Sequence, residues 1–352
     1  MFLKYCKKHD IYHLLSECPV CKSERTVKSL DDVDIRKRLK TFSDLDIPVL
    51  VMCPPIIQKL YIDNNVWMEQ FDEQMKKYFS YEKLFLQWYQ IWQTLSMEAL
   101  CLTLPADPTL QDTPWVNSFV WLPHVEEPTI VLSNFKAEGR SREIDIAKTF
   151  LETCGYKTYQ IPDPEWFFEG FPDLKWLYDN IYVAGFGERT TEQALDWIAE
   201  KFDCKIIKVA RTTPENYHAD TVLCPISPTK VMCVIPDCDK KALKELEKYA
   251  EIIPIEDKKL GEYCITNNIV IGYTIYAGTY LDVFEPDTED WEIEMRKLEK
   301  LQEIAINHGY DLVVFETGQF LAFGAALSCT ATPLNYGNQW TSQKVWSEYG
   351  NK

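Results

Sequence analysis

Apolar and polar residues follow one another along this chain in a pattern that recurs five times. Each repeat has a short apolar run typical of a buried strand, then an amphipathic stretch typical of a helix, then a second apolar run. In the third repeat, Ala194, Ile198 and Phe202 follow helical spacing, which predicts a helix with one face packed on a sheet. The five units span residues 48–105, 129–162, 180–210, 230–256 and 269–316.

Five similar units without long linkers between them predict an α/β repeat architecture rather than a series of separate domains. Gly155 and Gly309 stand where two of the helices are expected to end, a position that glycine often occupies. The alternative is an open, doubly wound α/β sheet. No glycine-rich phosphate-binding loop follows the first strand, which weakens that alternative.

The net charge, the N-terminal sequence and the length of the apolar runs exclude some classes of function. The chain has 352 residues and a formal net charge of −17. This argues against nucleic acid as a partner, because phosphate backbones require clustered Lys and Arg, and it could help to attract a cationic substrate. The N-terminus lacks the apolar stretch of a secretion signal and no run is long enough to span a membrane, so we expect a cytoplasmic protein. Its twelve cysteines are then expected to be thiols or metal ligands rather than disulfides.

Three loops between the predicted elements carry residues suited to nucleophilic chemistry. One contains Glu169 among aromatic residues, a second contains His218 and Asp220, and a third contains Cys329 among small residues. An imidazole beside a thiol increases its ionised fraction and can protonate a leaving group. Further carboxylates would hold a planar guanidinium by paired hydrogen bonds. Taken singly, each residue also fits a structural role, such as an inert buried thiol or a paired buried acid.

These loops resemble those of the pentein superfamily, a group of enzymes that modify guanidines. The similarity extends, in order, over roughly residues 48–334. It rests on VLVMCPP (49–55), NNVWM (64–68), WVNSF (115–119), VLSNF (131–135), FFEG (167–170), AGFGERT (184–190), YHADTVLCPI (217–226) and ALSCTATPL (326–334). The resemblance implies an α/β fold of the five-bladed αβ-propeller type, in agreement with the five predicted units.

The resemblance also implies a role for individual residues. Cys329 would be the nucleophile that adds to the guanidinium carbon and forms a covalent thiouronium intermediate. His218 would protonate the departing amine and later accept a proton from water. Glu169 would bind the guanidinium and pair with the histidine, and Asp220 would be a second guanidinium ligand. Arg189 would hold the carboxylate of the substrate, although a structural salt bridge is an alternative for this residue.

Within the superfamily the chain most resembles the arginine dihydrolase branch, which releases ornithine, carbon dioxide and ammonia. That branch has an asparagine at the position of Asn65 and another at the position of Asn117. An amide both donates and accepts hydrogen bonds, so Asn117 could hold a neutral urea-like product for a second hydrolysis. The chain departs from the family pattern at Phe171 and Pro172, where a glycine-rich stretch is expected. A bulkier pocket could exclude free arginine, so the predicted substrate is arginine or a close analogue.

The predicted function is therefore hydrolysis of a guanidino group, of the arginine dihydrolase or deiminase type. An amidinotransferase that uses the same intermediate is an alternative, because the two differ only in whether water or an amine reaches that intermediate. A non-catalytic binding module of the same fold is an alternative of another class. The chemistry requires no organic cofactor, the partner is a small-molecule guanidine, and a homo-oligomer is compatible with the sequence.

The N-terminal segment carries a separate set of candidate ligands. Cys6 and His9 form one pair, Cys18 and Cys21 form a second, and eight residues separate the pairs. Such a set matches a structural, four-coordinate zinc site, in which His13 could replace His9. The chain is accordingly predicted to consist of a zinc-knuckle-like segment (1–25), a connector (26–45), a catalytic propeller (46–337) and a C-terminal tail (338–352).

Overall fold

The computed structural model describes residues 4–8, 11–13, 41–57, 65–70, 78–337 and 340. The chain divides into two units, Met1–Lys40 and Thr41–Lys352. In the smaller unit, β1 (Lys4–Cys6) and β2 (Ile11–His13) pair in antiparallel fashion. The predicted connector 26–45 extends across the boundary between the two units, and the division into four parts remains a prediction.

The described part of the larger unit alternates strands and helices. Its described helices are α3 (Val66–Gln70), α5 (Tyr81–Leu95), α6 (Ser141–Thr153), α7 (Glu192–Lys201), α8 (Lys240–Leu246), α9 (Lys258–Glu262) and α10 (Glu289–His308). Short 3-10 helices are η1 (Phe42–Asp44), η2 (Glu138–Arg140), η3 (Ala219–Thr221), η4 (Ile235–Asp237), η5 (Gly318–Phe323) and η6 (Leu327–Thr330).

The strands that the structure describes in the larger unit form five three-stranded sheets. The sheets are β17 (Ala331–Asn335) with β3 (Val49–Met52) and β4 (Leu100–Thr103); β5 (Phe119–Leu122), β6 (Thr129–Leu132) and β7 (Lys157–Tyr159); β8 (Leu174–Tyr178), β9 (Ile181–Phe186) and β10 (Lys205–Arg211); β11 (Leu223–Ser227), β12 (Lys230–Val234) and β13 (Glu251–Ile255); and β14 (Ile269–Ile271), β15 (Thr274–Thr279) and β16 (Asp311–Glu316).

All five sheets have the same design. The middle strand of each sheet pairs antiparallel with one neighbour and parallel with the other. Parallel neighbours require a crossover connection, and α5, α6, α7, α8 and α10 supply it in turn. The five strand–helix–strand units predicted from the sequence are therefore confirmed, and each gains an additional antiparallel strand that the sequence pattern did not indicate.

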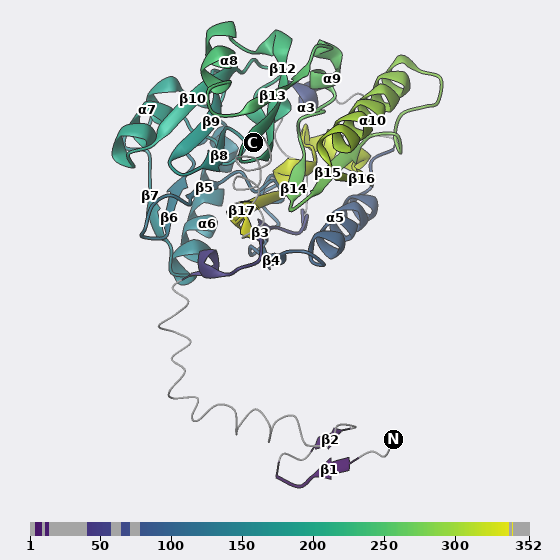
Figure 1. Cartoon of the computed structure of the whole chain (residues 1–352). Helices are drawn as coiled ribbons and strands as arrows, with labels where there is room; N and C mark the ends of the chain where they lie inside the picture. The colour runs from purple at the N-terminus through teal and green to yellow at the C-terminus, as the bar shows by residue number, and fades with distance from the viewer. Residues whose placement is uncertain are drawn as a thin grey trace, which may run out of the picture. The chain divides into compact units, whose positions relative to one another are not determined.

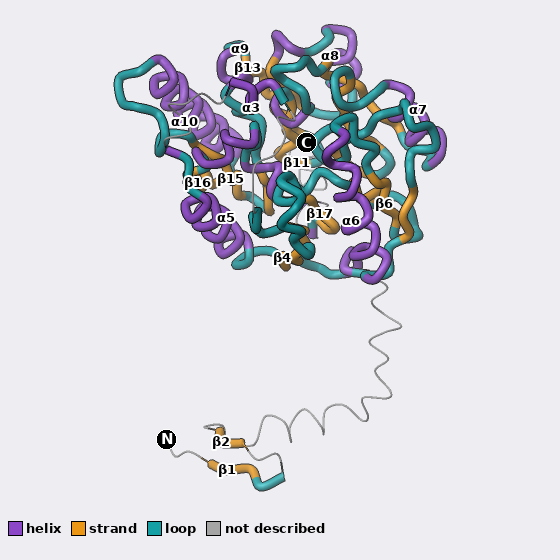
Figure 2. The backbone as a smooth tube through the Cα atoms, turned by 180° about the vertical axis from the view of Figure 1, so that it is seen from behind, coloured by secondary structure: helices purple, strands orange, loops and turns teal. Residues whose placement is uncertain are grey.

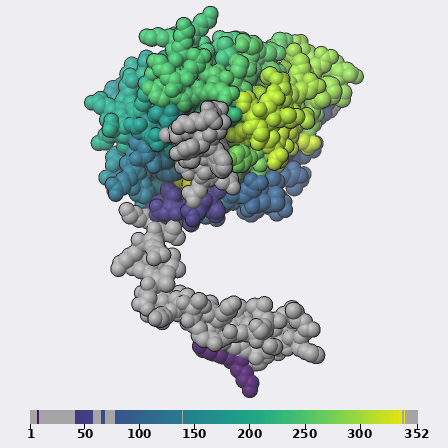
Figure 3. All heavy atoms as spheres, viewed as in Figure 1, coloured from purple at the N-terminus to yellow at the C-terminus, as the bar shows by residue number. Residues whose placement is uncertain are grey.

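The sheets of the larger unit follow one another in space as they do in sequence. Helices α5, α7, α8 and α10 lie along its rim, with strands toward the middle, and Figure 2 shows the same arrangement from behind (Figure 1). Successive parts of the chain occupy successive sectors of the face seen in Figure 3. The last strand, β17, pairs with β3, so the C-terminal strand completes the sheet of the first unit.

The helices form where the sequence predicts them, because helical spacing of apolar residues and capping residues occur in the same segments. In α5, Ser80 caps the N-terminus by accepting a hydrogen bond from the Lys83 amide, 3.3 Å away. Leu84 and Ile91 on the same helix are completely buried. Helix α10 ends at Gly309, whose φ of +75° is left-handed and so favours glycine. No helix in the described part of the chain is long and apolar enough to cross a membrane.

Candidate active site

Four of the predicted site residues occupy equivalent positions in different sheets. Asn117 precedes β5, Glu169 precedes β8, His218 precedes β11 and Cys329 precedes β17, in each case the strand that pairs antiparallel with the middle strand. The repeated fold therefore presents one loop from each unit in the same way. Loops held by rigid sheets are the usual carriers of catalytic groups.

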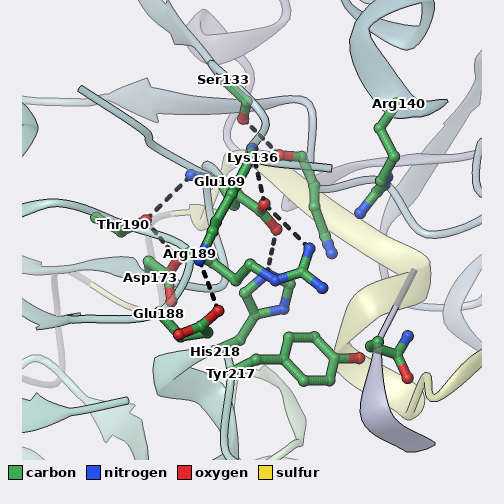
Figure 4. Close-up of polar contacts among 12 residues, drawn as sticks. Ser133, Lys136, Arg140, Glu169, Asp173, Glu188, Arg189, Thr190, Tyr217 and His218 are labelled. Atoms are coloured by element: carbon green, nitrogen blue, oxygen red, sulfur yellow. Dashed lines mark hydrogen bonds and ion pairs between the residues drawn. The ribbon is translucent and has the colours of Figure 1, made fainter. Parts of the chain in front are cut away.

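Glu169 and His218 form a buried, hydrogen-bonded pair. The Glu169 Oε2 atom lies 2.8 Å from His218 Nε2, and neither side chain is more than 3% exposed. The Arg189 Nη1 atom donates to Glu169 Oε1 at 3.3 Å. Burial alone would raise the pKa of Glu169, but the hydrogen bond from His218 and the charge of Arg189 lower it to about 2. Figure 4 shows the three side chains facing one another.

Because Glu169 is ionised, it can only accept hydrogen bonds, so His218 Nε2 carries a proton. The other ring nitrogen, Nδ1, makes no hydrogen bond to the described residues and is left to exchange a proton. The pair thus has the arrangement of a general acid–base with an orienting carboxylate.

Local structure keeps Glu169 in place. Gly170, directly after it, has a φ of +72°, and a side chain there would collide with the carbonyl oxygens of Asn117 and Phe119. The Glu169 amide donates to Thr190 Oγ1 at 3.1 Å, and the Thr190 hydroxyl donates to Asp173 Oδ2 at 2.5 Å (Figure 4). The backbone at Glu169 is therefore fixed by the tight turn at Gly170 and by the hydrogen bond to Thr190.

Asp173 links this segment to the histidine loop. Its Oδ1 atom accepts a hydrogen bond of 2.8 Å from the Ala219 amide, directly after His218. Burial raises the pKa of Asp173 to about 6. The position of Asp173 assigns it to holding the Glu169 and His218 loops together.

Cys329 lies in η6 and is 5% exposed. Asn267 makes two hydrogen bonds to this segment. Its Oδ1 atom accepts from the Ser328 amide at 2.6 Å, and its Nδ2 atom donates to Cys329 Sγ at 3.9 Å. Burial, and secondly the negative charge of Asp220, raise the pKa of Cys329 to about 12. The thiol is therefore protonated at neutral pH unless a cation is brought close to it.

Asp220 lies beside the nucleophile with half of its carboxylate engaged. Its Oδ2 atom accepts a 2.5 Å hydrogen bond from Ser328 Oγ. Its Oδ1 atom is buried and has no hydrogen-bond partner in the described structure. A buried carboxylate oxygen without a partner is costly and calls for a ligand that supplies a donor.

Two cavities adjoin Cys329 and His218, and both residues line both cavities. The larger cavity has a volume of about 200 Å³ and is also lined by Asp220 and Asn267. The smaller has a volume of about 20 Å³, close to the space that one water molecule needs. Cys329 and His218 are thus brought together in a space that a small ligand can enter.

The remaining predicted residues lie around the smaller cavity. Asn65, Asn117 and Arg189 all line it. Asn65 is tied into the fold, because its Nδ2 atom donates to the Phe323 carbonyl at 3.0 Å and its Oδ1 atom accepts from the Met68 amide at 3.0 Å. The Oδ1 atom of Asn117 is buried without a partner in the described structure, so it remains able to accept from a ligand.

Two residues at the site were missed in the sequence. Arg140 lines the smaller cavity and is held by Glu143, whose Oε2 atom lies 2.8 Å from Arg140 Nη2. Asn267 contacts the nucleophile from the loop before β14, the position in the fifth sheet that corresponds to the other site loops. The five-fold repeat was the signal that could have indicated Asn267. Arg140 has no comparable signal, because a single arginine near a helix usually lies on the surface.

The candidate zinc ligands cannot be placed in the same way. His9, Cys18 and Cys21 lie outside the described residues, and of Cys6 and His13 the structure describes only the backbone, in β1 and β2. Among the described residues no group of three or more metal-binding side chains is assembled. The zinc site therefore remains a prediction from sequence.

Comparison with known proteins gives one related sequence. No protein-family model matches the chain. The bifunctional arginine dihydrolase/ornithine cyclodeaminase ArgZ of Synechocystis sp. is 27% identical over 209 residues. The match covers 57% of this chain and 28% of ArgZ, so the chain spans less than a third of this relative.

Solved structures show the same fold. The crystal structure of apo ArgZ, an arginine dihydrolase of cyanobacteria, superposes with a TM-score of 0.69 at 21% identity, over 82% of this chain and 40% of that one. The N-terminal domain of ArgZ with a covalently bound reaction intermediate gives a TM-score of 0.68 at 22% identity, over 82% and 99% of the two chains.

A dimethylarginine dimethylaminohydrolase adduct with S-methyl-L-thiocitrulline gives a TM-score of 0.58 at 16% identity, over 82% and 99% of the two chains. The α/β fold with five small sheets therefore matches that of pentein enzymes. The resemblance of this chain to the pentein superfamily, and within it to the arginine dihydrolases, is confirmed.

Proposed function

We propose that this protein hydrolyses C–N bonds of a guanidinium group, with Cys329 as the nucleophile and His218 as the proton donor and acceptor. The observation that carries the proposal is the 2.8 Å hydrogen bond between His218 and ionised Glu169, in a space that His218 shares with Cys329. A nucleophile, a base and a group that orients the base are the three parts that covalent catalysis requires.

The electrostatics of the site favour a cationic substrate. A guanidinium beside Cys329 would bring in the positive charge that the buried thiol lacks and would lower its pKa. It would also give the free Asp220 Oδ1 atom a hydrogen-bond donor. Substrate binding and thiol activation would therefore occur together.

The chemistry then proceeds in two stages. Cys329 gives its proton to His218 and adds as a thiolate to the guanidinium carbon to form a C–S bond, and the tetrahedral adduct then loses one nitrogen as an amine that takes this proton from His218. This leaves a thiouronium on Cys329. Water then gives a proton to His218 and adds to the same carbon, and the C–S bond breaks to free the thiolate.

The substrate is arginine or a close analogue, and Arg189 is the group that the resemblance assigns to its carboxylate. One round of hydrolysis converts arginine into citrulline and ammonia. A second round, in which the urea group is hydrolysed, gives ornithine, carbon dioxide and a second ammonia. The free Asn117 Oδ1 atom supports retention of a neutral urea for the second round, and a replacement of Asn117 by Asp that left the product pattern unchanged would contradict this part of the proposal.

We further infer that the five sheets form a closed five-bladed αβ-propeller. The pairing of β17 with β3 supports closure, since it joins the last part of the unit to the first. A cytoplasmic location is supported by the cysteines, because all nine whose side chains the structure describes are free thiols.

The proposal is tested by product analysis with the full-length protein. Wild type and Cys329→Ala are incubated with L-arginine and a panel of other guanidines, and the products are identified by mass spectrometry. Cys233→Ala is the control, because Cys233 is completely buried and lines neither cavity. We expect wild type and Cys233→Ala to release ammonia and Cys329→Ala to release none.

The product identifies the reaction. Citrulline from arginine indicates one hydrolysis and ornithine with two ammonia indicates two. Product that forms only after an amine is added would replace hydrolysis by amidino transfer. An absence of product with every guanidine, in all three proteins, would contradict the proposed function as a whole.

A further inference from the structure

Another cavity lies apart from the two at Cys329. Its volume is about 50 Å³, and it shares no lining residue with either of them. Strands β8, β11, β14 and β17, which pair antiparallel with the middle strands of their sheets, each contribute to its wall. The active-site residues lie in the loops before these strands, whereas this cavity, called here the strand cavity, lies among the strands themselves.

The strand cavity carries a single positive charge. Lys175 is the one charged residue among its described lining residues, and no carboxylate lines it. Cys224 also lines it, but burial raises the pKa of this thiol to about 11, so it is neutral at pH 7 and cannot act as a counter-ion. A cationic cavity is unexpected in a chain whose formal net charge is −17.

Lys175 differs from the other buried cations of the described structure. It is 6% exposed, and it forms no hydrogen bond or ion pair with any described residue. Arg140, Arg189 and Lys297 are buried too, but each pairs with a carboxylate, at 2.8, 3.3 and 2.6 Å respectively. An ammonium that is removed from water without such a partner is costly, so Lys175 calls for a partner that the described residues do not supply.

The surroundings of Lys175 offset this cost only in part. Its Nζ atom lies 3.4 Å from the centroid of the Phe171 ring, and a ring face attracts a cation less strongly than a carboxylate does. Asp220 and Asp173 act on Lys175 only through their charges, because their hydrogen bonds are made to active-site residues. Burial accordingly lowers the pKa of Lys175. The N–H groups of its ammonium therefore remain available to a ligand in the cavity.

Tyr336 offers a second donor to the strand cavity. Its ring packs against those of Trp176 and Trp340, with centroids 5.5 and 4.9 Å apart, which holds the side chain in place. Burial raises the pKa of Tyr336, so the hydroxyl keeps its proton, and this hydroxyl forms no hydrogen bond with any described residue. Tyr336 and Phe171 are themselves partly exposed, so a small ion can reach the cavity from solvent.

We propose that the strand cavity is a binding site for a small monovalent anion, held by the Lys175 ammonium and the Tyr336 hydroxyl. Its volume of about 50 Å³ is far below the about 150 Å³ of an engineered cavity that accepts benzene, which limits the ligand to a halide or a carboxylate group. The anion supplies the counter-ion that Lys175 lacks among strands of four sheets, so its binding stabilises the larger unit. This site is independent of the proposed hydrolysis.

The first test is thermal unfolding of the full-length protein in sodium bromide, sodium formate and sodium gluconate at equal concentration. Gluconate has the carboxylate of formate on a chain that is too large for the cavity. We expect the Tm of the wild type to be about 2 °C higher in bromide or formate than in gluconate when the ion is at about ten times its dissociation constant. A shift with formate alone identifies a carboxylate site, and a shift with bromide alone identifies a halide site.

Three variants test the assigned residues. Lys175→Met keeps the length of the side chain and removes its charge, so we expect the difference between salts to vanish. Tyr336→Phe removes one donor to the anion and should weaken binding about tenfold. Lys244→Met, on the exposed side of α8, is the control and should behave as wild type. The difference between salts is compared within each protein, because Lys175→Met also removes a buried charge and each salt has a general effect on stability.

Bromide-soaked crystals of the wild type provide a measurement that does not depend on the folding of any variant. We expect an anomalous peak within hydrogen-bond distance of Lys175 Nζ. Absence of both the peak and the thermal shift would overturn the proposal and leave Lys175 as a buried lysine without a ligand. A peak without a thermal shift would mean an adventitious ion only, and a shift that Lys175→Met retains would overturn the assignment to this cavity.

Discussion

The acids at this site are held in contrasting ways. Glu169 is fully buried but compensated by His218 and Arg189, so it stays ionised with a pKa of about 2. Asp220 has one oxygen engaged by Ser328 and one without a partner in the described structure. The first is suited to orienting a base and the second to receiving a ligand. Asp220 also acts on Cys329, since its charge helps to raise the pKa of the thiol.

Removal of the Asp220 charge should make Cys329 more reactive while it weakens catalysis. The pKa of about 12 leaves little thiolate at pH 8, and Asp220→Asn lowers that pKa, so the thiolate fraction rises. We expect alkylation of Cys329 by iodoacetamide to accelerate about tenfold if the pKa falls by about one. Asp145→Asn, the same change on the exposed side of α6, is the control. Equal rates in the two variants would show that Asp220 does not govern the thiol.

Glu169 should make stability depend on pH in the acid range. Its pKa of about 2 in the folded protein lies below the ordinary value of 4.5, so its stabilisation is fully present above about pH 4.5 and is lost as pH falls toward 2. A shift of this size corresponds to about 3 kcal/mol. Glu169→Gln should therefore be less stable than wild type in urea at pH 7, with the difference shrinking toward pH 3. For Glu165→Gln, an exposed control, the difference should be near zero throughout. A difference for Glu169→Gln that stays constant with pH would contradict the ion-pair account.

At the scale of elements, hydrophobic periodicity predicted the repeated strand–helix–strand units but not the additional antiparallel strand of each sheet. The middle strands and crossover helices were predictable because they combine apolar runs with helical spacing. The strand that pairs antiparallel with the middle strand of each sheet was harder to predict, and prolines are one reason. Pro225 lies within β11 and Pro333 within β17, and proline normally argues against a strand. Both strands lie at the edge of their sheets, where a missing N–H is tolerated.

In the site, too, some residues could be predicted from local sequence patterns and others could not. Cys329, His218 and Glu169 belong to recognisable loop patterns, and the structure brings His218 into contact with Glu169 and places Cys329 on the same cavities. Asn267 and Arg140 reach the site through packing between distant segments, which no local pattern encodes.

The N-terminal Cys and His spacing gives a prediction that is independent of the larger unit. Cys6, His9, Cys18 and Cys21 should hold one zinc per chain. We expect inductively coupled plasma mass spectrometry to find this zinc after dialysis, and Cys18→Ser with Cys21→Ser to abolish it. Cys101→Ser, in β4, should retain the metal. Purified wild type without zinc would refute the assignment.

At the scale of the whole larger unit, β17 connects its two ends. Leu334 on this strand is completely buried in a core that also contains Val49 and Val51 of β3. The net charge of the whole chain, −17, would favour the approach of cations. The stability of the larger unit therefore depends on the assembled sheets rather than on single loops.

Truncation of Leu334 should destabilise this unit as a whole. Leu334→Ala removes buried contacts between the last strand and the first unit, at a cost of about 2–5 kcal/mol. We expect the midpoint of urea unfolding to fall in one cooperative transition. Ile306→Ala, at a position on α10 that is 70% exposed, should leave the midpoint nearly unchanged. Unfolding of β17 alone, in a separate transition that leaves the midpoint for the remainder of the unit unchanged, would contradict closure through this strand.

The central claim, covalent catalysis by Cys329, is tested most directly by intact-protein mass spectrometry after rapid acid quench during turnover of a reactive guanidine. The account predicts an added mass equal to the thiouronium, on the peptide that contains Cys329, in wild type but not in Cys329→Ala. Turnover by Cys329→Ala at the rate of the wild type, or an adduct on another residue, would contradict the account.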